Sequence, residues 1–408
     1  MIINGDCLEE MRKMEDNSIS AIVTDPPYGL HFMGKDWDKF NKSNFDEKCD
    51  HKIVKRTGEK NPERLRGIRS IYSANAVSGT YDETRNDEFE SFIEQFGIEA
   101  LRIVKPGGHI LMFGAPRRYH RQVSGLEDAG WKIRDCLVWI FGSGFPKSHN
   151  HFGIEGYGTA LKPAYEPIIM AMKPCEGTFK QNAEKWGQAG INIDGSRIAS
   201  DDDLIRECLG HAGALHEGYK RPYHELAEKK IYGSTKGRWP ANVIFDEESS
   251  KQLDSMTGFE ASRFFYCAKA SSSERNEGLE SFIDKKMTYM ATSNGTGNPS
   301  ITTDDQGKER DRFSSIKKNN HPTVKPLKLM QYLIKLVMPP KDGVLLDPFA
   351  GSGTTILAAH QLGLKAIGIE KSAEYCEIAR ARIENYKPDD NKELDLFDID
   401  KSKEAING

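Results

Sequence analysis

The sequence predicts an α/β fold built on a mostly parallel sheet, and two stretches of the chain support that prediction. Residues 1–173 and 321–388 both alternate short runs of β-branched and apolar residues with runs that repeat apolar residues at helical spacing. Strands and helices that alternate along a chain form parallel-rich sheets. Between these stretches, residues 174–320 lose the rhythm and become rich in glycine and polar residues, which predicts an irregular insert.

The composition limits the classes of function. The net charge of −4 gives no global basic field, so any contact with nucleic acid must come from local clusters. The seven cysteines have no metal-ligand spacing, and their odd number without a signal peptide predicts a cytoplasmic protein with no metal site. No apolar run is long enough to span a bilayer, so we expect no membrane partner.

The first strand is expected at residues 2–4, followed by a short helix in which Leu8, Met11 and Met14 repeat at helical spacing. Asp6 lies between the two. It therefore has two interpretations: a cap for the helix, or a carboxylate at the sheet edge that contacts a ligand.

The next strand, residues 19–23, ends in the segment Thr24-Asp25-Pro26-Pro27-Tyr28. Open α/β sheets bind ligands at the carboxyl ends of their strands, where Asp25 is expected. The two prolines stiffen the backbone and remove two N–H donors. A carboxylate, carbonyl oxygens and one aromatic ring remain, which suits a flat base with an exocyclic amino group. The alternative is a proline-stiffened turn without a function.

Residues from about 31 to 88 form a polar and locally basic insertion, expected to be a lid, a DNA clamp or a solvated loop. A helix over residues 89–104 and a Pro-Gly-Gly stop then precede a strand over residues 109–113, with further strands expected at 133–141 and 168–172. After the strand over residues 109–113 come three arginines beside aromatic residues: Arg117, Arg118 and Arg121. They are expected either to contact DNA phosphates or to begin a solvated helix.

In the insert, strands are expected only in isolation, over residues 241–245 and 263–267. Residues 270–320 are rich in serine, threonine, asparagine, glycine and charge, which predicts partial disorder without a ligand. An insert between two halves of a catalytic sheet suits a target-recognition region.

The segment His321-Pro322-Thr323-Val324-Lys325-Pro326 opens a helix with an apolar face. Thr323 is expected to cap it, and the free N–H groups at its start favour an anion, with help from Lys325.

An apolar strand then ends at Asp347 and runs into Pro348-Phe349-Ala350-Gly351-Ser352-Gly353-Thr354, the start of another helix. The two glycines let the backbone approach a ligand closely. The following strand ends in Glu370, placed to hold ribose hydroxyls. A dinucleotide site is the competing interpretation, but the rest of its glycine fingerprint is missing after Gly353.

These motifs resemble those of the S-adenosylmethionine-dependent DNA amino-methyltransferases. Asp25-Pro26-Pro27-Tyr28 resembles their motif IV, Phe349 to Gly353 motif I, Glu370 motif II and the segment from His321 to Pro326 motif X. The order of the motifs resembles the β group of the family, which has a permuted Rossmann-like sheet with helices on both faces. The resemblance covers residues 1–173, expected to be the catalytic half, and 321–388, expected to be the cofactor half, before a polar tail over 389–408.

The resemblance implies S-adenosyl-L-methionine as cofactor and double-stranded DNA as partner. It implies catalytic roles for Asp25, Pro26, Pro27 and Tyr28. It implies cofactor contacts for a larger set of residues: Asp6, Thr323, Lys325, Asp347, Phe349, Gly351, Ser352, Gly353, Thr354 and Glu370.

The activity that the resemblance implies is methyl transfer to a flipped-out base. Aspartate at the first position of motif IV is more usual in enzymes that methylate adenine N6, so adenine is favoured over cytosine N4. An RNA or protein-glutamine N-methyltransferase shares the acceptor chemistry, and a non-catalytic DNA-binding relative would carry a damaged motif. A homodimer and a restriction endonuclease partner are further expectations from the resemblance.

Overall fold

The computed structural model describes a main body and several short segments. The described residues are 1–28, 86–142, 154–200, 204–209, 229–232, 235–268, 279, 285–288, 301–303, 309–311, 314–317, 319, 321, 324–340 and 342–386. The predicted insertion at about 31–88 therefore lies outside them except for its last residues, and the polar tail at 389–408 lies outside them completely.

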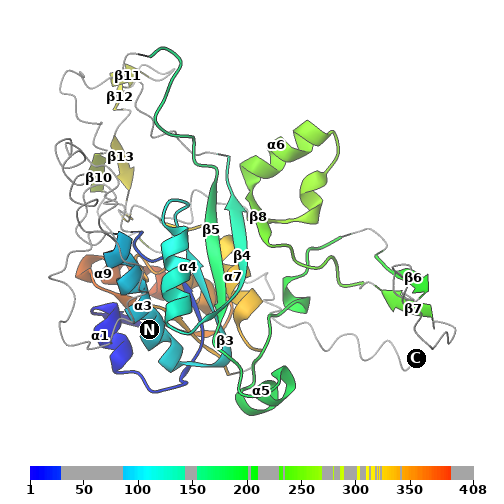
Figure 1. Ribbon diagram of the computed structural model, residues 1–408. Helices are drawn as coiled ribbons and strands as arrows, with labels where there is room; N and C mark the ends of the chain where they lie inside the picture. The colour runs from blue at the N-terminus through cyan, green and yellow to red at the C-terminus, as the bar shows by residue number, and fades with distance from the viewer. Residues whose placement is uncertain are drawn as a thin grey trace, which may run out of the picture.

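A nine-stranded sheet in the described residues takes its strands from both ends of the chain (Figure 1). In spatial order they are β1 (Ile2–Asn4), β15 (Lys365–Glu370), β14 (Val344–Asp347), β2 (Ile19–Thr24), β3 (Val104–Phe113), β5 (Tyr165–Met172), β4 (Lys132–Ile140), β8 (Val243–Asp246) and β9 (Tyr266–Ala268). Strand β5 is antiparallel to both of its neighbours, and every other pair is parallel. The prediction of an α/β fold with a mostly parallel sheet is confirmed.

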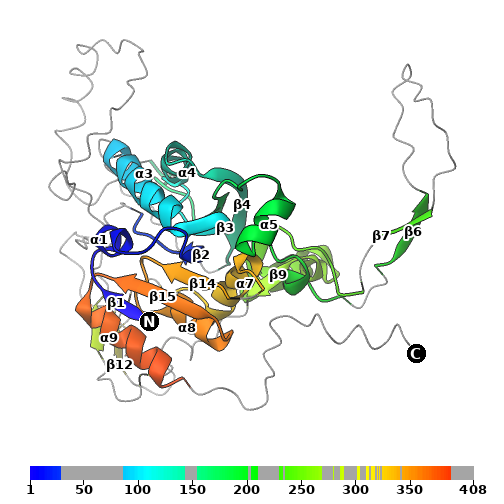
Figure 2. The ribbon, with the colours of Figure 1, turned by 90° about the horizontal axis from the view of Figure 1, so that it is seen from below.

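Helices cover both faces of this sheet (Figure 2). One face carries α1 (Cys7–Arg12), α3 (Asn86–Ile103) and α4 (Tyr119–Asp128), and the other carries α7 (Leu327–Val337), α8 (Thr354–Gln361) and α9 (Ala373–Glu384). Each layer buries its own apolar cluster against the sheet. Helix α7 buries Leu329, Leu333 and Leu336, and each fully buried leucine contributes on the order of 2 kcal/mol of transfer free energy.

Smaller elements lie along the predicted insert. They are α5 (Phe179–Trp186), α6 (Glu247–Thr257), the 3₁₀ turns η6 (Asp194–Ser196) and η7 (Ala261–Phe264), and three two-stranded pairs: β6 (Arg206–Leu209) with β7 (Lys229–Tyr232), β10 (Lys285–Thr288) with β13 (Ser314–Lys317), and β11 (Ile301–Thr303) with β12 (Glu309–Asp311). None of the helices within the described ranges is long and apolar enough to cross a membrane.

Two predictions about strands are wrong. Strands β8 and β9 are not isolated, because β8 pairs with β4 and β9 pairs with β8 at the edge of the main sheet. The pairing that joins these strands to the main sheet is that of β8 with β4, which lies far earlier in the sequence, so local spacing could not reveal it. Strand β3 begins at Val104, before the Pro-Gly-Gly segment, and its pairing with β2 shifts register there. Gly107 adopts a φ of +77°, and a Cβ there would lie 2.5 Å from the amide nitrogen of Asn182 on α5.

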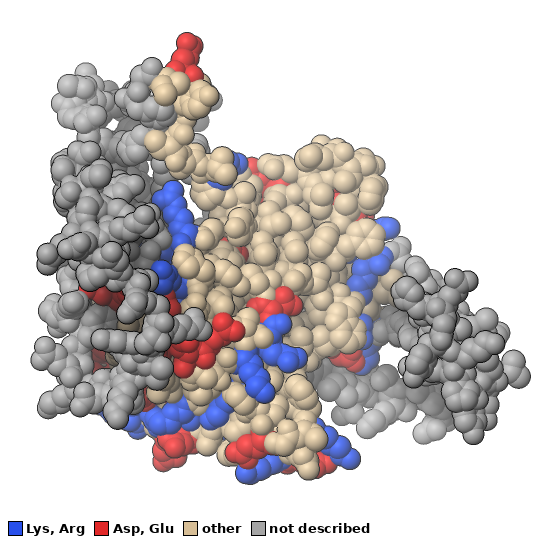
Figure 3. Space-filling view, in the orientation of Figure 1, with Lys and Arg blue, Asp and Glu red and all other residues tan. Residues whose placement is uncertain are grey.

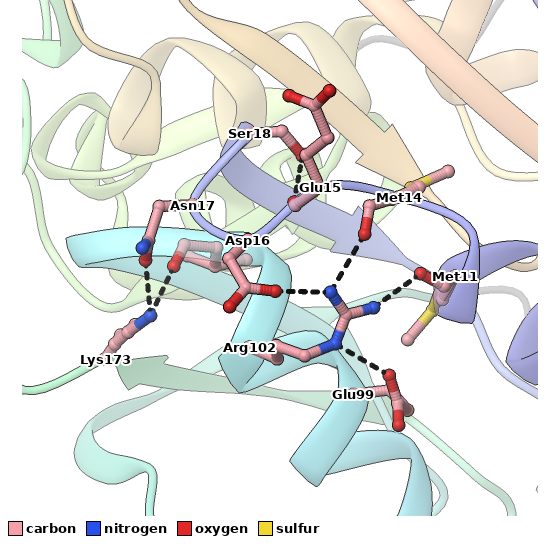
Figure 4. A network of polar contacts seen from close by, with 10 residues as sticks. Met11, Met14, Glu15, Asp16, Asn17, Ser18, Glu99, Arg102 and Lys173 are labelled. Carbon is pink, nitrogen blue, oxygen red and sulfur yellow. Dashed lines mark hydrogen bonds and ion pairs between the residues drawn. The ribbon is translucent and has the colours of Figure 1, made fainter.

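A half-buried arginine fixes the chain between α1 and β2 (Figure 4). The Arg102 guanidinium, on α3, donates to the backbone oxygens of Met11 at 2.9 Å and Met14 at 2.8 Å. It also pairs with Asp16 at 2.6 Å. Because this segment leads directly into β2, the contacts hold the strand that ends at Asp25.

Candidate active site

Four adjacent strand ends form one rim of the sheet (Figure 2). Strands β1, β15, β14 and β2 are parallel neighbours, and they lead respectively to Asp6, Glu370, Asp347 and Asp25. Strand β2 comes from the first part of the chain and β14 from the last, and they pair directly through Leu346 and Ile22. The predicted catalytic segment and the predicted cofactor turn therefore lie beside each other.

The Asp25 carboxylate is held at both oxygens. The Tyr28 hydroxyl donates to Oδ1 at 2.7 Å, and the Lys325 ammonium pairs with Oδ2 at 2.9 Å. The side chain of Asp25 keeps 18% of its surface exposed, so the carboxylate is partly open. Pro26 is buried and Pro27 half-buried, which matches the rigid turn that the sequence predicts.

Lys325 lies on the Asp25 side of the site, where sequence analysis had assigned it to the cofactor. Its ammonium pairs with Asp25 and, also at 2.9 Å, with Glu166 on β5. Burial alone lowers the pKa of Lys325, but the two carboxylates outweigh it and raise the pKa above its ordinary value. Two carboxylates already balance this cation, so Lys325 lies with Asp25 and Glu166 rather than with the glycine turn.

Asp347 joins the two halves of the sheet. Its carboxylate accepts from the Thr24 hydroxyl at 2.6 Å and from the backbone N–H of Phe349 at 3.1 Å. Burial raises the pKa of Asp347 to about 6, although hydrogen bonds from Thr24, Thr355 and Phe349 oppose the shift. The carboxyl group is 2% exposed, so it links β14 to β2 from inside the sheet rather than from its surface.

The glycine turn after β14 has the backbone that the sequence predicts. Gly351 has a φ of +52° and Gly353 a φ of +78°, a region that favours glycine. The side chains of Ser352 and Thr354 face inward, where the buried Arg382 donates to Ser352 Oγ at 3.3 Å and to Thr354 Oγ1 at 3.0 Å. Only the backbone of these two residues is left to contact a ligand.

Glu370 closes the turn from the next strand. Its carboxylate accepts from the backbone N–H of Gly351 at 2.9 Å and of Ser372 at 2.7 Å. Burial raises the pKa of Glu370, and these backbone hydrogen bonds oppose the shift. His321 lies on the other side of Gly351, and a Cβ at that glycine would lie 2.7 Å from its ring nitrogen.

The other predicted cofactor residues have local contacts. Asp6 caps α1 by accepting from the backbone N–H of Leu8 at 3.1 Å, and it stays about one-third exposed. Phe349 packs its ring on Phe96, with the centroids 5.6 Å apart. Thr323 lies outside the described residues, and the N-cap of α7 is Pro326.

Comparison with known proteins agrees with this geometry. The family model N6_N4_Mtase, described as DNA methylase, matches residues 19–381. This chain belongs to that DNA methylase family. The Type II methyltransferase M.HinfI of Haemophilus influenzae is 39% identical over 403 residues, which cover 98% of this chain and 72% of the relative. The Type II methyltransferase M.HindIII of Haemophilus influenzae is 25% identical over 403 residues and 94% of each chain.

Solved structures resemble this DNA methylase more distantly. The PvuII DNA methyltransferase, described as cytosine-N4-specific, has a TM-score of 0.45 and 14% identity, with 97% of this chain and 89% of that chain covered. The crystal structure of M1.HpyAVI has a TM-score of 0.40 and 14% identity, with 95% and 99% covered.

The three predicted DNA-contacting arginines of this methylase are not equivalent. Arg118 is 1% exposed, with its guanidinium 5.3 Å from the centre of the Phe89 ring, so the prediction of a phosphate contact there is wrong. Arg121 pairs with Glu90 and, at 3.5 Å, with Asp87. Arg117 is exposed. On the face drawn in Figure 3, Lys and Arg among the described residues lie in small groups between acidic side chains.

Sequence reasoning missed one residue of the methylase site. Glu166 reaches the rim because β5 is antiparallel, so its first residues lie beside the last residues of β3, with Ile168 opposite Phe113. The sequence segment Tyr165-Glu166-Pro167 before a buried strand was the available signal. This segment could not place Glu166 at the rim of the sheet, because the antiparallel direction of β5 was not predicted.

Proposed function

We propose that this DNA methylase transfers a methyl group from S-adenosyl-L-methionine to the exocyclic N6 of adenine in double-stranded DNA. One observation carries the proposal. The Asp25 carboxylate, fixed by Tyr28 and Lys325, lies at a strand end directly beside the strand that leads into the glycine turn. A hydrogen-bond acceptor for an amino group therefore adjoins the place where the family binds its methyl donor.

The residues of the rim fit the methyl donor. The carboxylate of Glu370 has lone pairs left to accept from ribose hydroxyls, and Gly351 and Gly353 give the neighbouring turn its tight, positive-φ backbone. Asp6 is the exposed carboxylate on the neighbouring strand end. When bound, S-adenosyl-L-methionine supplies a methyl group already activated by its sulfonium sulfur.

The protein must make a weak nucleophile reactive. The lone pair of an aromatic amino group is delocalised into the ring, and hydrogen bonds from its N–H groups to Asp25 and to the Pro26 carbonyl localise that pair on nitrogen. With the donor bound, that pair would form the N–C bond as the C–S bond breaks with its electrons staying on sulfur, and the proton lost from nitrogen would pass to the Asp25 carboxylate or to water. Positioning and fixed charge supply most of the rate enhancement.

The target base must leave the duplex. Flipping costs a few kcal/mol, and stacking on an aromatic ring returns about 1–3 kcal/mol. Tyr28 supplies the ring beside Asp25. Residues 174–320 are proposed to read the target sequence, although β8 and β9 within them belong to the main sheet. A homodimer and a restriction endonuclease partner stay predictions.

The experiment identifies the methylated nucleoside. DNA of mixed sequence is incubated with the protein and S-adenosyl-L-methionine, digested to nucleosides and separated by mass spectrometry. We expect N6-methyladenine, because aspartate occupies the first position of the Asp25 motif. N4-methylcytosine would move the target to cytosine, and methyl transfer to RNA or protein alone would overturn DNA as the substrate.

A further inference from the structure

Three charged side chains from distant segments, Asp25, Lys325 and Glu166, alternate in sign where the amino group of the target base is proposed to bind. We call this cluster the acceptor end of the site. The Lys325 ammonium lies 2.9 Å from Asp25 Oδ2 and 2.9 Å from Glu166 Oε2. Its side chain is 9% exposed, against 18% for Asp25 and 25% for Glu166. Asp25 follows β2, Glu166 lies near the start of β5, and Lys325 precedes α7.

The ammonium is enclosed as well as paired. It lies 4.7 Å from the centre of the Phe113 ring and 5.9 Å from that of Tyr28. Aromatic faces attract cations, and the attraction grows as water is removed. Taking a lysine out of water is costly unless its charge is matched, and here two carboxylates match it. Lys325 is therefore held in one place from several directions.

This arrangement fixes the plane of the Asp25 carboxylate. Tyr28 holds Oδ1 and Lys325 holds Oδ2, so rotation of the carboxylate would break at least one contact. Glu166 pairs with Lys325, which in turn pairs with Asp25, so Glu166 acts on Asp25 through the ammonium. A carboxylate fixed before the substrate arrives pays no reorganisation cost during the reaction.

From this geometry we infer that Glu166 and Lys325 are positioning residues that hold Asp25 in the orientation needed to accept a hydrogen bond from the target amino group. The inference rests on the proposed function. It assigns Lys325 to the methyl acceptor and gives Glu166, which lies outside the predicted motifs, a role in the reaction.

The central test is a double-mutant cycle of Glu166→Gln and Lys325→Met, read by the single-turnover rate of methyl transfer to DNA. We expect Glu166→Gln to lower the rate about tenfold and Lys325→Met about 100-fold. Because Glu166 acts through Lys325, adding Glu166→Gln to Lys325→Met should change the rate less than about twofold. Affinity for S-adenosyl-L-methionine, measured by calorimetry, should change less than about twofold in every variant.

The pH profile supplies a second readout. Among the residues that the structure describes, four titratable groups lie around Asp25: Tyr28 on its own loop, Lys325 before α7, Glu166 on β5, and Asp347 at the end of β14, whose pKa is raised by burial and, to a smaller extent, by the charge of Asp25. Losing the Lys325 cation should move the acid limb of the rate profile to higher pH by about one unit. Glu166→Gln leaves the cation to Asp25 alone and should move the limb to lower pH.

Lys335→Met is the matched control, because it removes a half-buried cation from α7 without touching Asp25. Its rate should stay within about twofold of the wild type. If Lys325→Met does not fold, Glu166→Gln carries the test alone through its rate and pH profile, since the amide keeps its size.

The outcomes separate the inference from the proposed function. Additive losses in the double mutant, or a weaker cofactor affinity of Lys325→Met with an unchanged saturated rate, would overturn the positioning role while the wild type still methylates DNA. An unshifted acid limb in Glu166→Gln would do the same. A wild-type protein that transfers no methyl group to DNA would instead overturn the proposed function, and the inference with it.

Discussion

The two ends of the site are built in different ways. At the acceptor end, side chains hold side chains: Asp25, Glu166 and Lys325 come from three distant segments and meet through ion pairs. The cofactor end consists of the glycine turn and Glu370, which belong to one strand–helix–strand unit, β14–α8–β15. There the backbone forms the contacts, as when the N–H of Gly351 donates to the Glu370 carboxylate at 2.9 Å. The reactive group is therefore held by tertiary structure, and the cofactor turn by local structure.

This difference has a physical cause. A turn that contacts a ligand through its backbone needs glycine and a short connection, and both are properties of neighbouring residues. A carboxylate that must keep one orientation needs partners from other elements, as Asp25 has in Lys325 beside Tyr28 of its own turn. Changes at the acceptor end should consequently alter the rate of methyl transfer, and changes at the cofactor end should alter affinity.

The largest expected effect is that of Asp25→Asn. The amide keeps the size of the side chain but loses the charge that Lys325 balances and one hydrogen-bond acceptor. We expect the single-turnover rate to fall by about 10³-fold, with cofactor affinity by calorimetry unchanged within about twofold. Asp246→Asn is the control, because Asp246 ends the parallel strand β8 in the same sheet and caps α6 away from the site. A normal rate in Asp25→Asn would remove the distinction between the two ends.

The connection between the two ends can be tested through Asp347. Burial raises its pKa from 3.8 to about 6, so the folded protein holds this proton more tightly than the unfolded chain does. The free energy of unfolding should therefore fall as pH rises through this range, by on the order of 2–3 kcal/mol from this one group.

Asp347→Asn removes that titration while its amide oxygen still accepts from Thr24. Urea unfolding of the variant and the wild type at pH values from about 4.5 to 7 would measure it, and the variant should gain stability relative to the wild type as pH rises. Parallel stability curves for the two proteins would show that Asp347 titrates as an ordinary carboxyl group.

The same contrast explains what could be predicted from the sequence. The glycine turn and Glu370 are read from consecutive residues, and the structure places them at neighbouring strand ends with the expected positive φ at Gly351 and Gly353. The pairing of β2 with β14 followed from the order of the two motifs. The strands and helices of both ends of the chain lie within a few residues of their predicted positions, apart from the early start of β3.

The features that sequence analysis missed all depend on distant partners. The two carboxylates that pair with Lys325 are those of Asp25, directly after β2, and Glu166, in β5. Nothing near Lys325 in the sequence indicates either partner. Arg118 is buried over Phe89, a residue of α3, so its basic and aromatic neighbourhood did not reveal that it packs in the core. Strands β8 and β9 were missed as part of the main sheet for the same reason, because β8 joins the sheet through the distant β4, and β9 joins it through β8.

At the cofactor end, Glu370→Gln should weaken binding and spare chemistry. The amide keeps one oxygen for a backbone N–H but presents an NH₂ group to the other, either Gly351 or Ser372. We expect about a tenfold weaker affinity for S-adenosyl-L-methionine by calorimetry, which is about 1.4 kcal/mol, and a rate at saturating cofactor within about twofold of the wild type. Glu377→Gln, an exposed site on α9, is the control. A lower saturated rate with unchanged affinity would reverse the assignment of the two ends.

The smallest expected effect comes from Tyr28→Phe, which separates the two contributions of one residue. The ring remains for stacking, and only the hydroxyl that donates to Asp25 Oδ1 at 2.7 Å is lost. Because Lys325 still holds Oδ2, the rate should fall only about fivefold, the equivalent of one hydrogen bond of about 1 kcal/mol. Tyr28→Ala, which also loses the ring, should fall further, and a DNA with 2-aminopurine at the target position should report weaker base flipping by fluorescence in Tyr28→Ala alone. Equal losses in the two variants would show that the hydroxyl is the only part of Tyr28 that matters, and that the acceptor end relies on fixing Asp25 without an aromatic platform for the base.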